Sequence, residues 1–250
     1  MTAADHIDHA QPHWLLHECR DAQQQASLLA GEIAARLRQA LQQRGQALLA
    51  VSGGKSPLAL FVALREQELD WQQVTVLLAD ERCVPGDHPD SNAALVRDHL
   101  LQGRAAQARW QPFFDQLPAG DSAGWPDASL AALADGANQR LAALGWPLDV
   151  LVLGMGEDGH TASLFPAAPG LQQALASASP LAWVRPATAP HARLTLTLPT
   201  LLAAGTIFLP LAGERKRQVF EQACRQPGAA LPVSLVLHQA ARPVQVWLAP

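Results

Sequence analysis

Leu148-Asp-Val-Leu-Val-Leu153 is followed directly by Gly154-Met-Gly-Glu-Asp-Gly-His-Thr-Ala-Ser-Leu-Phe-Pro166. The first six residues form an apolar run that is typical of a strand buried on both faces of a parallel sheet. The glycine-rich segment then lies at the carboxyl end of that strand, where open α/β sheets bind ligands. Two titratable residues, Asp158 and His160, are delivered to this position. The stretch therefore predicts an α/β fold with a ligand site at this loop.

On both sides of this stretch, strand-like apolar runs alternate with helical patterns. Strands are predicted over residues 47–51, 74–78, 110–114, 182–185, 193–198, 206–211 and 244–248. Helices are predicted over 21–43, 57–66, 91–101, 127–144 and 214–224. The helix over 21–43 places its apolar residues on one face, and Gly45 ends it; these apolar residues are Leu28, Leu29, Ile33, Leu37 and Leu41. The alternation favours a parallel sheet covered on both faces.

Length and composition indicate an ordinary globular protein. The 250 residues are enough for one large domain, and we expect a single domain over 1–250 with a flexible or loosely packed segment at 1–20. The net charge of -4 offers no general attraction for nucleic acid or anionic lipid. Residues 1–20 lack the pattern of a secretory signal, and no apolar stretch is long enough to span a membrane. We expect a small-molecule partner and a monomer or small homo-oligomer.

The cysteines and the N-terminal histidines have no spacing that predicts a structural site. Cys19, Cys83 and Cys224 are odd in number and contain no CxxC, which fits a reducing compartment and a cytoplasmic protein. Cys83 lies beside a predicted ligand loop and is either a reactive thiol or a small buried hydrophobe. Four histidines lie near the start of the chain, and His13 and His17 have the spacing of one helix face; the four are His6, His9, His13 and His17. We interpret these histidines as part of a frayed tail rather than a metal site, because no carboxylate or cysteine completes a coordination sphere.

Ser52-Gly53-Gly54-Lys55-Ser56-Pro57 forms the first of three candidate anion sites. Its glycines allow a tight turn in which backbone N–H groups can approach a phosphate at the start of a helix. Pro57 suits the first helical turn, where its missing N–H costs nothing. The segment is not a Walker A loop, and its alternative interpretation is a plain turn between strand and helix.

Two further candidate anion sites carry cationic side chains. Asp80-Glu81-Arg82 is predicted as a turn after a strand, where Arg82 can bind phosphate oxygens and Asp80 can accept hydrogen bonds from sugar hydroxyls. Arg193 begins a predicted strand, and Lys216 lies in the first turn of a predicted helix, where a cation opposes the helix dipole unless an anion is bound. The alternatives are a solvated charged turn for 80–82 and an exposed side chain for Lys216.

The glycines of the 154–166 segment formally match a dinucleotide fingerprint, but their context does not. In a dinucleotide fingerprint, an acidic residue about 20 positions later binds the ribose hydroxyls. This chain has no acidic residue between Asp158 and Glu214. Pro166 and Pro169 would also break the helix that such a motif opens. We therefore expect no nicotinamide cofactor and no resident metal. A serine-hydrolase elbow, GxSxG, is missing as well.

Taken together and in this order, five segments resemble the 6-phosphogluconolactonase family. They are 52–57, 79–92, 154–166, 193–197 and 213–216. The 154–166 block is the specific part, whereas the glycine loop at 52–57 and the GxxK segment at 213–216 are shared with sugar-phosphate relatives. The resemblance implies the fold of glucosamine-6-phosphate deaminase and ribose-5-phosphate isomerase, a modified doubly wound, Rossmann-like sheet. It also implies hydrolysis of 6-phospho-D-glucono-1,5-lactone in the oxidative pentose phosphate pathway, without a cofactor.

Two other functions are compatible with parts of the pattern. The deaminase pattern has a carboxylate five positions after the histidine, where this chain has Phe165, and phenylalanine cannot transfer a proton. A non-catalytic sugar-phosphate sensor would need only the anion site and usually adds a DNA-binding segment, for which the chain has no basic patch. Both observations favour the lactonase.

Lactone hydrolysis needs an oriented water, a base and donors for the developing oxyanion. His160 is the candidate base, since a free imidazole titrates at about pH 6.5. Either Asp158 or Asp80 is its carboxylate partner, and the sequence leaves this choice open. The substrate and its phosphate are expected to bind to Gly53, Gly54, Lys55, Ser56, Asp80, Arg82, Arg193 and Lys216.

Overall fold

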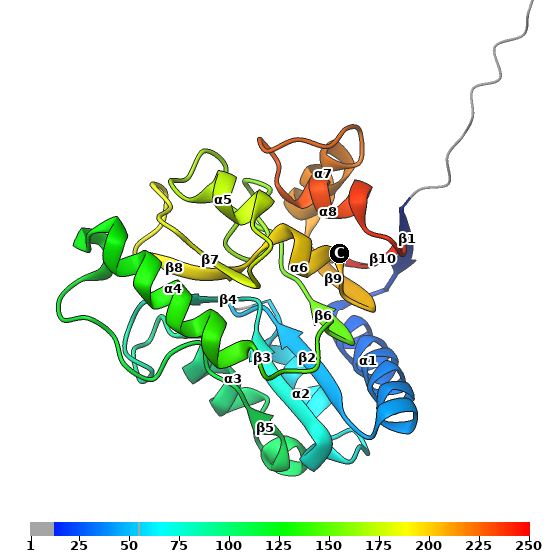
Figure 1. The fold of residues 1–250 in the computed structure, drawn as a ribbon. Coiled ribbons are helices and arrows are strands. Elements are labelled where there is room, and N and C mark those ends of the chain that lie inside the picture. Colours follow the sequence, from blue (N-terminus) through cyan, green and yellow to red (C-terminus); the bar gives the residue numbers. More distant parts are fainter. Residues whose placement is uncertain (1–12, 55) are drawn as a thin grey trace, which may run out of the picture.

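A computed structural model describes residues 13–54 and 56–250. Figure 1 shows two sheets surrounded by helices. The larger sheet contains β1 (Trp14–Glu18), β2 (Ala47–Val51), β3 (Val74–Leu78), β5 (Arg109–Trp110), β6 (Val150–Val152), β9 (Thr206–Ala212) and β10 (Val244–Ala249). The smaller sheet contains β4 (Asp80–Arg82), β7 (Leu181–Val184) and β8 (Arg193–Leu196).

The α-helices are α1 (Ala22–Arg44), α2 (Leu58–Arg65), α3 (Asn92–His99), α4 (Asp127–Leu141), α5 (Leu171–Ala176), α6 (Leu198–Leu202), α7 (Glu214–Ala223) and α8 (Val233–Gln239). Short 3-10 turns occupy Trp71–Gln73, Gly103–Gln107 and Ser122–Gly124. Helix α1 packs along α2 on one side of the large sheet, and α7 and α8 cover the other side (Figure 1). This arrangement confirms the predicted α/β class and the helices on both faces.

The large sheet is parallel throughout and doubly wound. Its strand order is β1-β10-β9-β6-β2-β3-β5, and every pairing in it is parallel. From β2 the chain extends the sheet outward through β3 and β5, then returns to place β6 on the other side of β2. The order therefore reverses between β2 and β6. Ligands bind at such a switch point, outside the carboxyl ends of the two strands.

Local sequence explains why α1 begins and ends where it does. The Asp21 carboxylate accepts a hydrogen bond from the backbone N–H of Gln24 at 2.7 Å and caps the helix. Gly45 adopts φ 72°, a left-handed conformation that ends the helix as the sequence predicts. Leu29, Ile33 and Leu37 are fully buried, whereas Leu28 is 49% exposed, so the predicted apolar face was one residue too wide.

Several short elements differ from the sequence analysis: β5 covers Arg109–Trp110 instead of 110–114, and α5, α6 and α8 were not predicted. Residues 14–18, expected in a loose segment, form edge strand β1, so the first strand precedes 47–51. His17 consequently lies on a strand rather than a helix, where it stacks on Trp247 with ring centroids 4.5 Å apart. Asp80-Glu81-Arg82 is a strand paired antiparallel with β8, not a turn. The histidines at positions 6 and 9 lie outside the described residues.

Candidate active site

A cavity of about 190 Å³ lies at the switch point between β2 and β6. The backbone N–H of Ser52, directly after β2, donates to the Val152 carbonyl at the end of β6, at 2.9 Å. This bond holds the two glycine-rich loops side by side at the mouth of the sheet. Among the polar residues that line the cavity are Ser52, Ser56, Asp80, Arg82, Asn92, His160, Arg193 and Lys216, together with Gly53 and Gly54.

The loop after β2 makes a close approach that only glycine allows. A β-carbon on Gly53 would overlap the side chain of Asn92, and Gly54 has φ 93°, which disfavours any other residue. Across the cavity, Nζ of Lys216 donates to Oγ of Ser56 at 3.0 Å. Burial lowers the pKa of the Lys216 ammonium, while the charge of Glu157 raises it. Lys55, predicted to bind phosphate, lies outside the described residues.

Arg193 is a buried cation at the base of the cavity. Its side chain is only 7% exposed, and its Nη1 lies 4.0 Å from Oδ2 of Asp80. Burial lowers the pKa of the guanidinium, and the Asp80 charge opposes that shift. The same Asp80 oxygen accepts a hydrogen bond of 2.6 Å from the Ser163 hydroxyl. Asp80 thus holds Arg193 and the 154–166 loop together.

Arg82 reaches the cavity from β4 and is fixed by the loop that follows. Its Nη1 donates to the backbone carbonyl of Asp90 at 2.5 Å. Glu81, the residue before it, is buried and caps α3 by accepting hydrogen bonds from the backbone N–H groups of Asn92 and Ala93 at 2.9 and 2.7 Å. Burial raises the pKa of the Glu81 carboxyl, and these N–H donors act in the opposite direction. Glu81 therefore has a structural role in placing Arg82 and Asn92.

His160 is held on two sides. Its Nδ1 lies 2.5 Å from Oδ1 of Asp158, and its ring stacks on Phe165 with centroids 4.0 Å apart and planes 21° apart. A β-carbon on Gly156 would overlap the imidazole, so the glycine allows the ring to lie against the loop. Because a carboxylate can only accept, the contact favours the tautomer with the proton on Nδ1. Nε2 is then the nitrogen that can take a proton.

The Phe165 ring also packs under the Arg193 guanidinium, whose central carbon lies 4.9 Å from the ring centroid. Such cation–π contacts stabilise a buried guanidinium. Imidazole, phenyl ring and guanidinium therefore pack in sequence along one wall of the site. Phe165, which in the sequence only separated two functions, thus contacts both His160 and Arg193.

Several buried polar atoms at the cavity have no hydrogen-bond partner among residues 13–54 and 56–250. They include Ser52 Oγ, Asn92 Oδ1, Arg82 Nε and Arg193 Nε. Buried polar groups in proteins are normally paired, because leaving one unpaired costs about 1–3 kcal/mol. All four residues line the cavity, so its wall is strongly polar.

The structure brings together most of the site residues that the sequence analysis named. Gly53, Gly54, Ser56 and the four charged residues at 80, 82, 193 and 216 line one cavity with His160. Asp158 lies at its edge and contacts the imidazole, whereas the hydrogen bond of Asp80 goes to Ser163. Of the two carboxylates that the sequence offers as partners of His160, Asp158 is therefore the one in contact with its ring.

Ser52 and Asn92 were not named as site residues. Ser52 belongs to the glycine loop at 52–57, and Asn92 follows the predicted cap Ser91. Nothing in the spacing of the sequence predicts that this loop and residue 92 meet. Only the three-dimensional approach of Gly53 to Asn92 shows it. The only sequence feature that could have pointed to Asn92 is its position in a loop, two residues after Asp90.

Residues 20–247 match the family described as glucosamine-6-phosphate isomerases/6-phosphogluconolactonase. The chain belongs to this family. It is 50% identical over 198 residues to a 6-phosphogluconolactonase of Pseudomonas aeruginosa, covering 78% of this chain and 79% of that protein. It is 43% identical over 224 residues to a 6-phosphogluconolactonase of Neisseria meningitidis, covering 89% and 93%.

Solved structures of the family have the same architecture. A 6-phosphogluconolactonase from Shewanella baltica superposes with a TM-score of 0.87 at 38% identity, covering 95% of this chain and 98% of that one. A monomeric glucosamine-6-phosphate deaminase superposes with a TM-score of 0.71 at 20% identity, covering 94% and 96%, a likeness that shows the fold alone. Among the described helices, none is both long and apolar enough to cross a membrane.

Proposed function

We propose that the protein is a 6-phosphogluconolactonase, which hydrolyses 6-phospho-D-glucono-1,5-lactone to 6-phospho-D-gluconate in the oxidative pentose phosphate pathway. The observation that carries this proposal is the Asp158–His160 pair at a cavity lined by Arg82, Arg193 and Lys216. Relatives at 43–50% identity that bear this name support it. A small substrate with an uncharged ring and one dianionic end fits a cavity that is lined by His160 and three cationic residues.

In this mechanism, Nε2 of His160 takes a proton from a water molecule as the water oxygen bonds to the lactone carbonyl carbon. Asp158 stabilises the resulting imidazolium and keeps the ring oriented. As the tetrahedral intermediate collapses, the bond from that carbon to the ring oxygen breaks, and the imidazolium returns the proton to this oxygen. The products are the carboxylic acid, which ionises, and the free hydroxyl group. No cofactor is needed for this balance.

The cationic residues act at the other end of the substrate. Arg82, Arg193 and Lys216 bind the phosphate together with N–H groups of the Gly53–Gly54 turn, and Lys55 is proposed to join them. Asp80 accepts hydrogen bonds from sugar hydroxyls while it orients Arg193. Binding energy from the phosphate thereby positions the carbonyl against His160.

A direct assay separates this function from deamination. The purified protein is supplied with freshly generated 6-phosphoglucono-δ-lactone, and acid release above the spontaneous rate is recorded in a pH-stat. A parallel reaction contains glucosamine 6-phosphate, with ammonia as the readout. We expect accelerated acid release and no ammonia, because Phe165 stands where a second carboxylate would be needed. Ammonia release would replace the lactonase proposal with the deaminase.

Substitutions separate catalysis from binding. His160→Ala should lower kcat by roughly 10²–10⁴-fold while 6-phosphogluconate still binds, because the base is lost and the phosphate site is kept. Arg82→Ala should instead raise KM by roughly 10–100-fold, the effect of losing a charged hydrogen bond. His99→Ala, at the end of α3 and away from the cavity, is the matched control. Unchanged turnover in His160→Ala would remove this histidine from the mechanism.

We further propose a cytoplasmic enzyme that acts as a monomer or small homo-oligomer and binds no nucleic acid. All three cysteines are free thiols, which fits a reducing compartment. The net charge of -4 supports the absence of nucleic-acid binding. Light scattering coupled to size exclusion measures the mass in solution, and a mass above about four chains would contradict the proposed assembly.

A further inference from the structure

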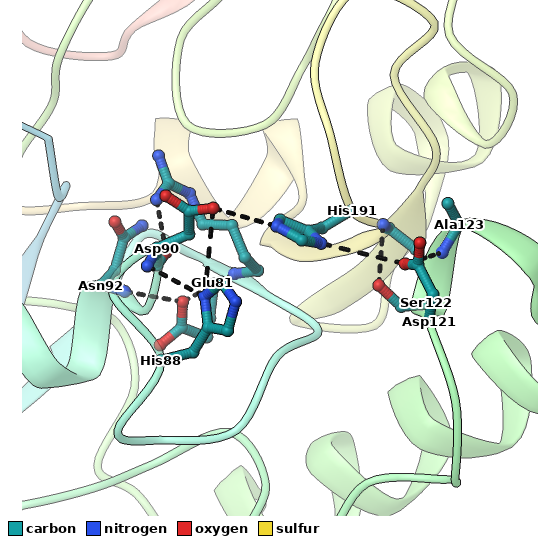
Figure 2. A network of polar contacts seen from close by, with 10 residues as sticks. Glu81, His88, Asp90, Asn92, Asp121, Ser122, Ala123 and His191 are labelled. Carbon is teal, nitrogen blue, oxygen red and sulfur yellow. Dashed lines mark hydrogen bonds and ion pairs between the residues drawn. The ribbon is translucent and has the colours of Figure 1, made fainter.

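Three metal-binding side chains meet beside the cavity, and the proposed hydrolysis uses none of them. His88 and Asp90 lie in the loop between β4 and α3, and His191 lies just before β8 (Figure 2). One ligand atom from each of the three residues lies within 4.8 Å of the others. No metal pattern is visible here in the sequence, because the two loops are about a hundred positions apart in the chain.

The distances suit a shared cation. Nε2 of His191 lies 3.0 Å from Oδ2 of Asp90, and Nδ1 of His88 lies 3.9 Å from the same oxygen. Two ligands of a tetrahedral zinc ion, each at about 2.0–2.2 Å from the metal, are separated by about 3.4 Å. The observed separations bracket this value. Ligation by Nδ1 of His88 would replace its hydrogen bond from the backbone N–H of Asp90.

A second carboxylate stands behind one of the histidines. Oδ1 of Asp121 lies 4.0 Å from Nδ1 of His191, the ring nitrogen that does not face Asp90 (Figure 2). Asp121 is itself oriented by the backbone N–H of Ala123, at 3.0 Å. A carboxylate on the far nitrogen of a ligating histidine is a common outer partner in metal sites, where it fixes the ring. His191 also has φ 68°, a backbone conformation that is costly for a residue with a side chain.

Charges of both signs surround the cluster. Arg82, which bonds to the Asp90 carbonyl, and Arg193 both oppose metal binding, and the carboxylates of Asp90 and Asp121 balance their two positive charges. Both carboxylates are more than half exposed, so an ion can enter from solvent. Two imidazole nitrogens and one carboxylate oxygen suit Zn²⁺ and similar transition metals better than Mg²⁺ or Ca²⁺.

We propose that His88, Asp90 and His191 bind a divalent transition-metal ion such as Zn²⁺, with the fourth position open to water. The ion would join the loop that leads to Asn92 with the loop that leads to Arg193, each two residues beyond a ligand. Two parts of the cavity wall would thus be joined from outside. This proposal stands on the cluster itself and does not depend on the proposed reaction.

Zinc titration of the full-length protein tests the site. Protein stripped with a chelator and dialysed is titrated with ZnCl₂ by calorimetry, as wild type, His191→Ala and Asp90→Asn. We expect each variant to lose one zinc equivalent or to bind it at least ~10-fold more weakly than the wild type. His99→Ala, a half-buried histidine outside the cluster, should keep the full number. Asp90→Asn is nearly isosteric and exposed, so it remains informative if His191→Ala folds poorly.

Other histidines can bind zinc, and the comparison separates them. Zinc lost on substitution of His160 or of the N-terminal histidines, but kept in His191→Ala and Asp90→Asn, would place the ion elsewhere and overturn the proposal. Equal stoichiometry and affinity in all variants, or no binding by the wild type, would do the same. As a second measurement, Zn²⁺ but not Mg²⁺ should raise the Tm of the wild type and leave that of His191→Ala unchanged.

Discussion

At the scale of single residues, the site depends on small groups that let larger ones approach. Gly156 lets the imidazole of His160 lie against the backbone, and Gly53 lets the Asn92 side chain approach the loop after β2. Phe165 supports the imidazole from one side and the Arg193 guanidinium from the other. The imidazole is therefore positioned partly by a glycine and a phenyl ring, neither of which can transfer a proton.

Gly156→Ala should reduce turnover without unfolding the protein. The added methyl group would overlap the His160 ring and come within 2.6 Å of the Asp158 carboxylate, so the ring must move. A displacement of about 1 Å can cost on the order of 10²-fold in rate. Steady-state kinetics with a circular dichroism spectrum check this.

Gly136→Ala provides the matched control for that substitution. Gly136 lies within α4 and has open space around it, so alanine should be tolerated there and even favour the helix. If Gly156→Ala and Gly136→Ala have the same kcat, the close packing of the imidazole on residue 156 does not matter for the reaction.

At the scale of elements, most strands and the longer helices were predictable, including the two longer strands of the small sheet, but the division into two sheets was not. The strands at 47–51 and 74–78 have continuous apolar runs, and the helix after Asp21 has a cap and a glycine stop, so local chemistry determines them. β4 has only three residues, Asp80-Glu81-Arg82, and is a strand because β8 pairs with it. β1 was missed because its Leu15 and Leu16 remain exposed at the sheet edge.

The candidate site was predictable in composition but not in its contacts. Asp158, His160 and the glycine loops follow buried strands, so their arrival at one edge follows from topology. The choice of Asp158 over Asp80 as neighbour of His160 depends on side-chain positions that no spacing encodes. The same holds for His191, which meets Asp90 because it lies just before β8, the strand that pairs with β4.

Cys83, next to the small sheet, should make the free energy of unfolding depend on pH. The backbone N–H of Cys83 continues the pairing of β4 by donating to the Ala192 carbonyl at 2.8 Å, and burial raises the pKa of its thiol from 9.0 to about 12. The unfolded chain therefore releases this proton first. Stability from the neutral thiol is complete below pH 9 and is lost as the pH rises towards 12. Between pH 7 and pH 10 the loss is about 1.4 kcal/mol.

Urea unfolding of the wild type and Cys83→Ala at pH 7 and pH 10 measures this effect. The wild type should lose more of its free energy of unfolding than the variant over this interval. A parallel pH dependence in the two proteins would mean that the thiol ionises equally easily in the folded and unfolded chains. Slow reaction of native Cys83 with iodoacetamide at pH 8 would agree with the raised pKa.

At the scale of the whole molecule, both sheets share one apolar core. A single cluster of buried residues includes Leu49 and Val76 of the large sheet and Leu194 and Leu196 of the small one. The single domain over 1–250 stays a prediction, and cooperative unfolding tests it. Tryptophan fluorescence and far-ultraviolet circular dichroism should give one coincident urea transition. Separate midpoints for the two probes would divide the chain into independent units.

The crossing of the chain between β2 and β6 has a consequence for how the enzyme comes into being. The residues that line its cavity come from segments between Ser52 and Lys216. Strand β6, which leads to the loop with His160, lies between β2, which precedes it in the chain, and β9, which follows it. A fragment that ends before Lys216 therefore lacks part of the site. During synthesis or refolding, we expect catalysis only after β6 has paired with both β2 and β9, so turnover reports a late stage of folding rather than its onset.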